Sequence, residues 1–231
     1  MRRQPLHQLL GISMDKMPVT DYTIGMGTIE EMKAKLQAHP WPCYKIKVGG
    51  PHDVDAVRQL RAATDAPFRV DANEGWTFEE AIELLPELQK LNVQLVEQPL
   101  PRDRHEEMKE LKALSPLPLF ADESCRTEDE VKKCAEAFHG INIKLTKCGG
   151  ITPALRMIKE ARALGLKVMI GSMNESTIGT AAIATLMPLV DEADADGPLL
   201  LKEDVAAGLT YNEGKITLSP GSGLAVKFTG K

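Results

Sequence analysis

Short apolar runs rich in β-forming residues recur along this 231-residue chain, and each ends in a polar or charged cluster. Three acids, Asp71, Glu97 and Asp122, follow such runs at steps of 26 and 25 residues, and Lys144 follows another run 22 residues later. A repeat of this length, with its chemistry at the carboxyl end of each strand, is typical of a (β/α) barrel. The repeat therefore predicts an α/β fold that gathers its functional groups at one end.

Eight apolar runs are expected to be strands, and the segments between them have helical periodicity. Three of these segments open with a Thr-x-x-Glu capping box, at Thr28, Thr77 and Thr127. Strands that alternate with helices indicate a parallel sheet, and eight of them indicate closure into a barrel. The predicted strands are 21–26, 43–48, 67–71, 93–97, 117–122, 140–145, 166–171 and 193–196, and the named helices are 28–38, 77–91, 131–138 and 153–164.

Two ends of the chain do not fit a plain barrel. Residues 1–20 are predicted to be a lead-in segment with a short helix over 5–10, and residues 21–207 are predicted to form the barrel. Residues 208–231 are rich in Gly, Pro and turn residues, with one alternating run over 215–218. This tail has apolar residues without an obvious place in a barrel, so we expect it to pack against a further element.

Composition excludes several classes of protein. A net charge of −5 gives no electrostatic reason to expect nucleic acid or an anionic membrane as a partner. No apolar run is long enough to span a membrane, and no signal-peptide pattern opens the chain. The four cysteines, Cys43, Cys125, Cys134 and Cys148, lack zinc-ligand spacing. We expect them to be free thiols in a reducing cytoplasm.

The three acids are candidate metal ligands. Because neighbouring barrel strands lie about 4.8 Å apart, carboxylates at three consecutive strand ends converge. A set of oxygen ligands with open positions suits Mg²⁺, or Mn²⁺, better than zinc. The alternative is that each acid caps the helix that follows it, which Asp often does. Three uncompensated carboxylates would repel one another, so Asp71, Glu97 and Asp122 are predicted to bind one cation.

Lysines flank the acids on both sides of the predicted barrel. Lys45 and Lys47 lie two residues apart on one strand and therefore point the same way, while Lys144 lies across the barrel. A Lys-x-Lys pair is often a solvated edge, but here it closes a buried strand, where we expect burial to lower the pKa of a lysine. Such a lysine is a competent general base. Two bases on opposite sides of a metal suit a reaction that removes a proton from one face of a carbon and returns it to the other.

Several segments resemble the enolase superfamily in its muconate-cycloisomerase-like branch. They are YKIKVG, DANEGWT, EQPLP, ADES, INIKLTKCGG and GSMNES, in the family's order. The resemblance implies a TIM barrel in the modified (β/α)7β form and a Mg²⁺-stabilised enediolate. It implies that Lys47 and Lys144 are the acid/base pair and that Lys45 neutralises the substrate carboxylate. Lys147 belongs to the same motif, but its position favours Lys144.

Asp194 and Asp196 lie two residues apart after the eighth predicted strand. This Asp-x-Asp is similar to that of dipeptide epimerases such as those acting on L-Ala-D/L-Glu, in which the pair holds the substrate ammonium. Two carboxylates across the mouth from the metal make a sensible cation site, although a solvated acidic turn is the alternative. Four further residues are expected to line the substrate pocket, with barrel packing as their alternative role: Thr23, Ser172, Met173 and Asn174.

Members of the family carry an N-terminal α+β capping domain, and this chain begins where that domain would lead into the barrel. We therefore expect a barrel without its cap, with the 208–231 tail placed to pack on one. The leading hypothesis is a Mg²⁺-dependent dipeptide epimerase acting on a small dipeptide, with homo-oligomers compatible. The alternatives are a cycloisomerase, an o-succinylbenzoate synthase, an N-acylamino-acid racemase, or a non-catalytic barrel fragment that binds a metal or a partner chain.

Overall fold

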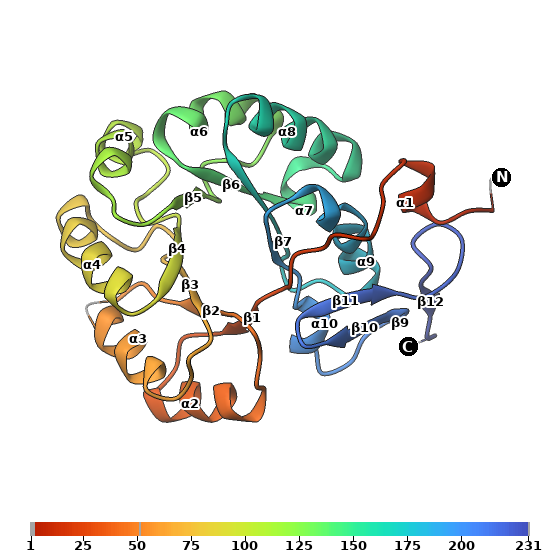
Figure 1. The fold of residues 1–231 in the computed structure, drawn as a ribbon, viewed down its shortest axis with the longest axis horizontal. Coiled ribbons are helices and arrows are strands. Elements are labelled where there is room, and N and C mark those ends of the chain that lie inside the picture. The colour runs from red at the N-terminus through yellow and green to blue at the C-terminus, as the bar shows by residue number, and fades with distance from the viewer. Residues whose placement is uncertain (1–2, 51, 231) are drawn as a thin grey trace.

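Eight parallel strands form the centre of the molecule in the computed structural model, which describes residues 3–50 and 52–230. The strands are hydrogen-bonded in chain order, as a barrel requires, and helices surround them (Figure 1). All eight predicted strands are present, and their bounds differ slightly from the prediction. They are β1 Tyr22–Ile24, β2 Tyr44–Lys47, β3 Phe68–Asp71, β4 Val93–Glu97, β5 Leu119–Ala121, β6 Gly140–Lys144, β7 Lys167–Gly171 and β8 Glu192–Asp194.

The outer layer consists of helices between successive strands. In the part of the chain that the structure describes, the one helix after β8 is the four-residue α10, so the (β/α)7β form is confirmed. Across the described part of the chain, no helix has the length and apolar character that a membrane crossing would need. The helices are α2 Ile29–Ala38, α3 Asp53–Arg61, α4 Phe78–Lys90, α5 His105–Leu114, α6 Val131–Ala137, α7 Leu145–Cys148, α8 Ile151–Ala163, α9 Thr177–Leu186 and α10 Gly197–Leu200, with 3-10 turns at Glu128–Glu130 and Met187–Leu189.

Local sequence explains where several helices begin. The Thr28 and Thr77 capping boxes are confirmed. In each, the threonine hydroxyl accepts the backbone N–H of the glutamate three residues later, and the carboxylate of that glutamate accepts the threonine N–H. Helix α8 begins at Ile151 rather than at the predicted Pro153. Gly149 and Gly150 have φ angles of 95° and 112°, a region that glycine adopts readily, and they separate α7 from α8.

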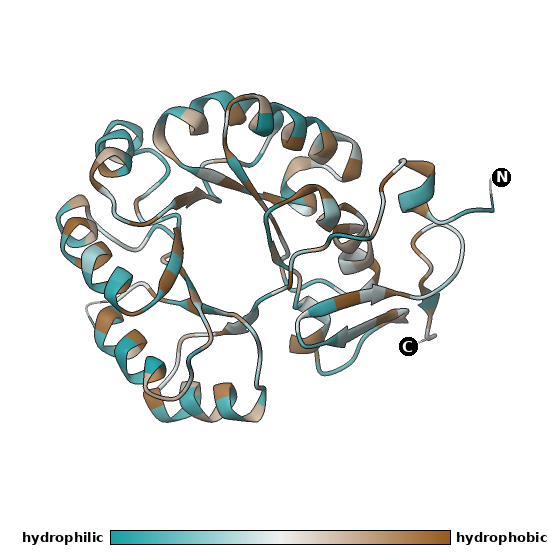
Figure 2. Ribbon diagram, viewed as in Figure 1, coloured by the Kyte–Doolittle hydropathy of each residue, from teal (hydrophilic) through white to brown (hydrophobic). Residues whose placement is uncertain are grey.

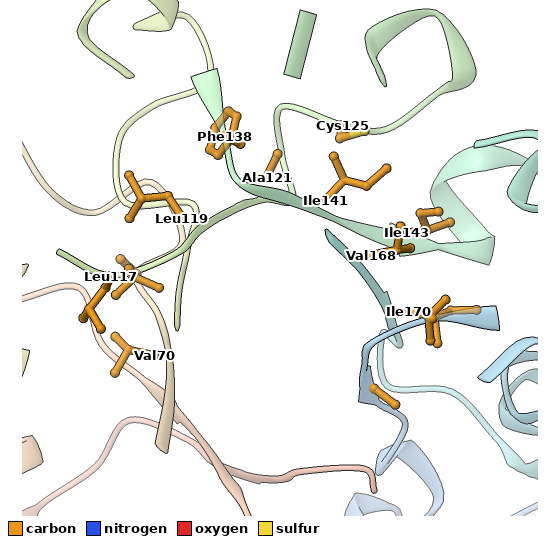
Figure 3. Packing of buried hydrophobic residues seen from close by; sticks show 14 of the residues in the cluster. Val70, Leu117, Leu119, Ala121, Cys125, Phe138, Ile141, Ile143, Val168 and Ile170 are labelled. Carbon is orange, nitrogen blue, oxygen red and sulfur yellow. The ribbon is translucent and has the colours of Figure 1, made fainter. Parts of the chain in front are cut away.

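The core lies between the strands and the helices. Val70, Ile141, Val168 and Ile170 are fully buried there (Figure 3). The hydropathy colouring shows hydrophobic residues along β5 and β6, while the surrounding helices carry both kinds of residue (Figure 2). This pattern is that of a parallel sheet covered by amphipathic helices.

A second, smaller apolar cluster is formed by Leu95, Phe120 and Met169 on β4, β5 and β7. Leu95 and Phe120 each lie two residues before a predicted metal ligand, Glu97 or Asp122, and so point to the same side of the sheet. The cluster therefore fills the barrel interior beneath the polar groups at the strand ends.

The barrel closes between β8 and β1 without a regular ladder. One parallel bridge joins Thr20 to Ala193, and the Thr20 hydroxyl accepts the Ala195 N–H at 2.7 Å. Arg69 reaches across the interior and donates to Asp21 Oδ2 at 2.9 Å and to the Ala193 carbonyl at 2.8 Å. The Asp21 N–H also donates to the Ala193 carbonyl at 3.2 Å, so side chains at this seam supplement a backbone hydrogen bond where the other strands have a regular ladder.

The lead-in segment and the tail lie beside each other and against the barrel (Figure 1). The short helix predicted over 5–10 is confirmed as α1, Leu6–Leu9. The Leu6 N–H donates to the Gly223 carbonyl, the Thr20 N–H to the Gly214 carbonyl, and the Tyr211 hydroxyl to the Ala195 carbonyl. Packing of this tail on a capping domain stays a prediction. Within the tail, β10 Leu209–Asn212 pairs with β11 Lys215–Leu218, while β12 Lys227–Phe228 pairs with β9 Ala206–Ala207, which lies just before the tail.

Candidate active site

A cavity of about 440 Å³ opens at the carboxyl ends of the strands. Every residue predicted to bind substrate lines it, and so do the three predicted catalytic lysines. Two predicted metal ligands, Asp71 and Glu97, are buried with 0% and 1% exposure. The lining residues are Thr23, Lys45, Lys47, Asn73, Asp122, Glu123, Lys144, Lys147, Ser172, Met173, Asn174, Asp194, Asp196 and Leu200.

The three acids lie on neighbouring strands, as predicted. Asp71 and Glu97 end β3 and β4 and are register partners, and Asp122 directly follows β5. All three are buried. Buried carboxylates are costly unless positive charge lies beside them. The nearest positive charges in this site are lysines.

Lys45 is held by three carboxylates. Its ammonium nitrogen lies 2.8 Å from Glu97 Oε2, 2.8 Å from Asp194 Oδ2 and 3.0 Å from Asp71 Oδ2. Burial alone would lower the pKa of Lys45, but the charges of these acids outweigh it and raise that pKa well above its ordinary value. The predicted lowering is therefore wrong for Lys45, because the sequence argument treated the ammonium as unpaired.

The two predicted acid/base lysines, Lys47 on β2 and Lys144 on β6, come from opposite sides of the barrel (Figure 1). Lys47 Nζ lies 2.6 Å from Asp71 Oδ2, and Lys144 Nζ lies 2.6 Å from Asp122 Oδ2 and 3.8 Å from Glu97 Oε1. Burial would lower the pKa of Lys144, but Glu97 and Asp122 outweigh it and raise it. The predicted lowering is therefore wrong for Lys144 as well. The carboxylates lie between the two lysines.

The acids retain an excess of negative charge. Burial, together with the charge of Asp71, raises the pKa of Glu97 to about 7 despite the nearby Lys45 and Lys144. The pKa of Asp71 moves the other way, because Lys45 and Lys47 outweigh the effect of burial. Because burial and a neighbouring carboxylate raise the pKa of Glu97, additional positive charge at this point would stabilise its ionised form.

This donor set fits Mg²⁺. Its oxygens are hard carboxylate ligands, which magnesium prefers over the nitrogen and sulfur ligands of zinc. Over the residues that the structure describes, no three His, Cys, Asp or Glu side chains already converge on one point. Lysine ammonium groups lie between the acids instead: Lys45 between Asp71 and Glu97, and Lys144 between Glu97 and Asp122. Positive charge thus already bridges neighbouring members of the set.

The two aspartates of the Asp-x-Asp have different partners. Asp194 contacts Lys45, and the burial that would raise the pKa of Asp194 is outweighed by that lysine, which lowers it. Asp196 accepts the Thr23 N–H at 2.6 Å. Lys45 bridges Asp194 to Glu97, and the placement of the pair across the mouth from the metal stays a prediction. Of these two aspartates, Asp196 has no lysine partner among the contacts described.

The titration of Asp196 gives a testable pH dependence. Burial and the charge of Asp194 raise the pKa of Asp196 from its ordinary value of 3.8 to about 6. The folded state then holds this proton more tightly than the unfolded state, so the stabilisation is complete below pH 4 and is lost as the pH rises to 6. Relative to wild type, Asp196→Asn should gain on the order of 3 kcal/mol in unfolding free energy across that window. Denaturant titrations at each pH measure it, and a constant difference would contradict it.

Sequence reasoning missed several residues of the site. Asn142, fully buried, donates to Glu97 Oε1 at 2.8 Å. Lys147, which the sequence analysis set aside in favour of Lys144, has its Nζ 2.5 Å from Asp122 Oδ1. Asn142 lies two residues before Lys144, and Asn73 two residues after Asp71, so spacing could have placed both on the site face. Leu200 had no such signal, because only the turn after β8 brings it to the cavity.

The fold and site match known proteins. Residues 27–231 match the family described as Enolase C-terminal domain-like. An L-Ala-D/L-amino acid epimerase of Flavobacterium johnsoniae is 49% identical over 96% of this chain and 66% of its own length. An L-Ala-D/L-Glu epimerase of Bacteroides thetaiotaomicron is 37% identical over 96% of this chain and 59% of its own length. The chain thus spans about two thirds or less of these relatives.

Solved structures agree with the sequence matches. A dipeptide epimerase from Cytophaga hutchinsonii, complexed with Mg and D-Ala-L-Val, superposes with a TM-score of 0.92 and 31% identity, over 98% of this chain and 66% of that one. A muconate cycloisomerase from Pseudomonas fluorescens superposes with a TM-score of 0.90 and 29% identity, over 98% and 67% of the two chains.

Proposed function

Because this chain belongs to the Enolase C-terminal domain-like family, we propose that it is the barrel of a Mg²⁺-dependent dipeptide epimerase. The reaction moves one proton at the α-carbon of a dipeptide's C-terminal residue. The observation that carries the proposal is the pair Lys47 and Lys144, which line one cavity from opposite sides with buried carboxylates between them. An epimerase needs one proton-transfer group on each face of the same carbon.

In the proposed mechanism, one lysine removes the α-proton and the other protonates the opposite face. Asp71, Glu97 and Asp122 would hold Mg²⁺, which supplies positive charge to the substrate carboxylate and so stabilises the developing negative charge by several kcal/mol. Lys45 lies against Glu97 with its side chain 2% exposed, where it adds positive charge at the floor of the site. It is fixed by its three carboxylate partners and therefore serves as an electrostatic group rather than a mobile base.

We assign the substrate's α-ammonium to Asp196, with Asp194 beside it. Asp196 lines the cavity, and its contact with the Thr23 N–H fixes its orientation. Thr23, Ser172, Met173 and Asn174 complete this side of the pocket. Binding of an ammonium group would favour ionised Asp196, whose burial otherwise favours the proton.

Asp196→Asn tests this assignment. Charge-assisted hydrogen bonds contribute about 1.5–3 kcal/mol, so the substitution should lower kcat/KM for a free dipeptide roughly 10- to 150-fold. The asparagine oxygen can still accept the Thr23 N–H, so the fold should survive. An N-acylated substrate has no ammonium and should lose far less. Equal losses for the two substrates would show that the role of Asp196 is structural. The proposal would then extend only to an enzyme of the muconate-cycloisomerase-like branch.

Two alternatives are distinguished by direct assays. A cycloisomerase, an o-succinylbenzoate synthase or an N-acylamino-acid racemase needs no ammonium site, and the likeness to muconate cycloisomerase keeps this group in view. Racemisation assays on Ala-Glu and on N-acyl amino acids separate it from an epimerase. A non-catalytic barrel would bind Mg²⁺ or a partner chain without turnover of either substrate.

We further propose a cytoplasmic setting and Mg²⁺ as the preferred ion, with Mn²⁺ as a substitute. The four cysteines are free, which fits a reducing compartment. Mn²⁺ takes the same kind of oxygen ligands as Mg²⁺. A homo-oligomer is compatible with this function, and size-exclusion chromatography with light scattering would establish it.

A further inference from the structure

The loop after β3 folds back over the end of its own strand. Asn73 and Glu74 have φ angles of 44° and 65°, in the left-handed region that asparagine enters more readily than most residues. The Asn73 N–H donates to Asp71 Oδ1 at 3.1 Å. This turn places the Asn73 side chain at the cavity wall, where it lines the site.

Two contacts fix the orientation of the Asn73 amide. Its Oδ1 accepts from Lys47 Nζ at 3.1 Å, and its Nδ2 lies 3.4 Å from Glu123 Oε1. An ammonium can only donate and a carboxylate can only accept, so flipping the amide would lose both contacts. Glu123 comes from the loop after β5, so the three side chains connect three segments of the barrel mouth.

Lys47 needs such a partner more than the other lysines do. Its side chain is 28% exposed, whereas those of Lys45 and Lys144 are 2% and 5% exposed. Its other described partner is Asp71, itself a proposed metal ligand. A long, flexible side chain with one shared partner is poorly oriented, and small misplacements of a base cost rate. Asn73 offers an acceptor that belongs to no proposed ligand.

We propose that Asn73 is a positioning residue for Lys47, and that Glu123 orients Asn73 in turn. The inference rests on the proposed function, since it assumes that Lys47 serves one face of the α-carbon. Asn73 then supports proton transfer on the face of the α-carbon that Lys47 serves and leaves the face that Lys144 serves unaffected. A residue that merely stabilises the fold would affect both faces alike.

Asn73→Gly tests the claim, because glycine accepts a positive φ and removes only the side chain. In deuterated water, exchange of the α-proton is followed by NMR separately for each epimer. Lys47→Ala and Lys144→Ala first identify which epimer each lysine serves. Asn73→Gly should then slow exchange of the Lys47 epimer roughly 10- to 100-fold, the effect of one charge-assisted hydrogen bond, and change the other by less than about 3-fold.

Asn92→Gly is the matched control. Asn92 also has a positive φ, 57°, but it is exposed at the end of α4, so its replacement should alter neither exchange rate. Equal slowing of both epimers by Asn73→Gly, or no slowing, would overturn the inference. If the lysine variants themselves fail to separate the two epimers, the acid/base assignment of the proposed function fails instead.

A second variant tests the part played by Glu123. Asn73→Asp alone would place two carboxylates together and should slow the Lys47 face. In the double variant Asn73→Asp with Glu123→Gln, the glutamine amide donates and the aspartate accepts, which reverses the wild-type contact. If this contact orients the acceptor for Lys47, the double variant should recover at least about half of the lost rate. Failure of the double variant to recover any rate would remove Glu123 from the arrangement.

Discussion

Glu97→Gln is expected to lower epimerase activity by at least about 10³-fold, the equivalent of about 4 kcal/mol in barrier height. The substitution keeps the shape of the side chain but removes the central negative charge of the three acids. Glu97 contacts Lys45 at 2.8 Å and Asn142 at 2.8 Å, so the amide also disturbs groups on both sides. Isothermal calorimetry should show Mg²⁺ binding at least about 10-fold weaker, because a ligand is lost.

Glu83→Gln is a suitable control, since Glu83 is exposed on α4 and carries the same charge. It should leave both activity and Mg²⁺ affinity unchanged. Unaltered Mg²⁺ affinity in Glu97→Gln would show that Glu97 is not a ligand. Weaker binding without loss of activity would show that the ion is structural.

Lys144→Ala is expected to abolish epimerisation while leaving α-proton exchange of one epimer intact. The remaining lysine, Lys47, can still remove and return a proton on its own face, but no group protonates the other. A positioned acid/base group accelerates proton transfer roughly 10²–10⁴-fold, and its removal forfeits that acceleration. Epimerisation needs both lysines, one after the other. NMR in deuterated water measures exchange and epimerisation in the same sample.

Lys147→Ala is the informative comparison, because Lys147 contacts the other oxygen of Asp122 and comes from the same motif. It should reduce rates for both epimers together if it only supports Asp122. If Lys147→Ala lost α-proton exchange of one epimer only, while Lys144→Ala retained exchange of both, Lys147 would be the acid/base group in place of Lys144. Wild-type epimerisation by Lys144→Ala would exclude Lys144.

Much of the fold could be predicted because each barrel unit carries local signals. β-rich apolar runs identified all eight strands, and the Thr28 and Thr77 capping boxes identified the starts of α2 and α4. Helices α3, α5 and α9 were not named in the prediction. The sequence of α9, TIGTAAIATL, is apolar on nearly every side and lacks a polar stripe. The predicted eighth strand, 193–196, begins one residue late and ends two residues late, because a three-residue strand has little periodicity of its own.

Site membership was more predictable than site geometry. Strand parity and strand-end position assigned the acids and lysines to one cavity, where the structure places them or buries them beneath it. The pairing of Lys45 with Asp194 could not be predicted, because it joins β2 to β8 across 149 residues. The predicted direction of the pKa shift was wrong for Lys45 and Lys144 for the same reason. A sequence pattern indicates burial, but it does not indicate which residue is the partner across a barrel.

The seam between β8 and β1 bears on how the chain folds. The contact from the Thr23 N–H to Asp196 spans 173 residues, so forming it costs roughly 4–5 kcal/mol of loop-closure entropy in an otherwise unfolded chain. Adjacent β/α units pair over far shorter separations and should assemble earlier. Ring closure is then a late event, and it is the event that brings Asp196 to Thr23. An incompletely folded chain would therefore lack the assembled site that we propose for the ammonium group. A dipeptide bound at that site would stabilise the closed barrel relative to open forms.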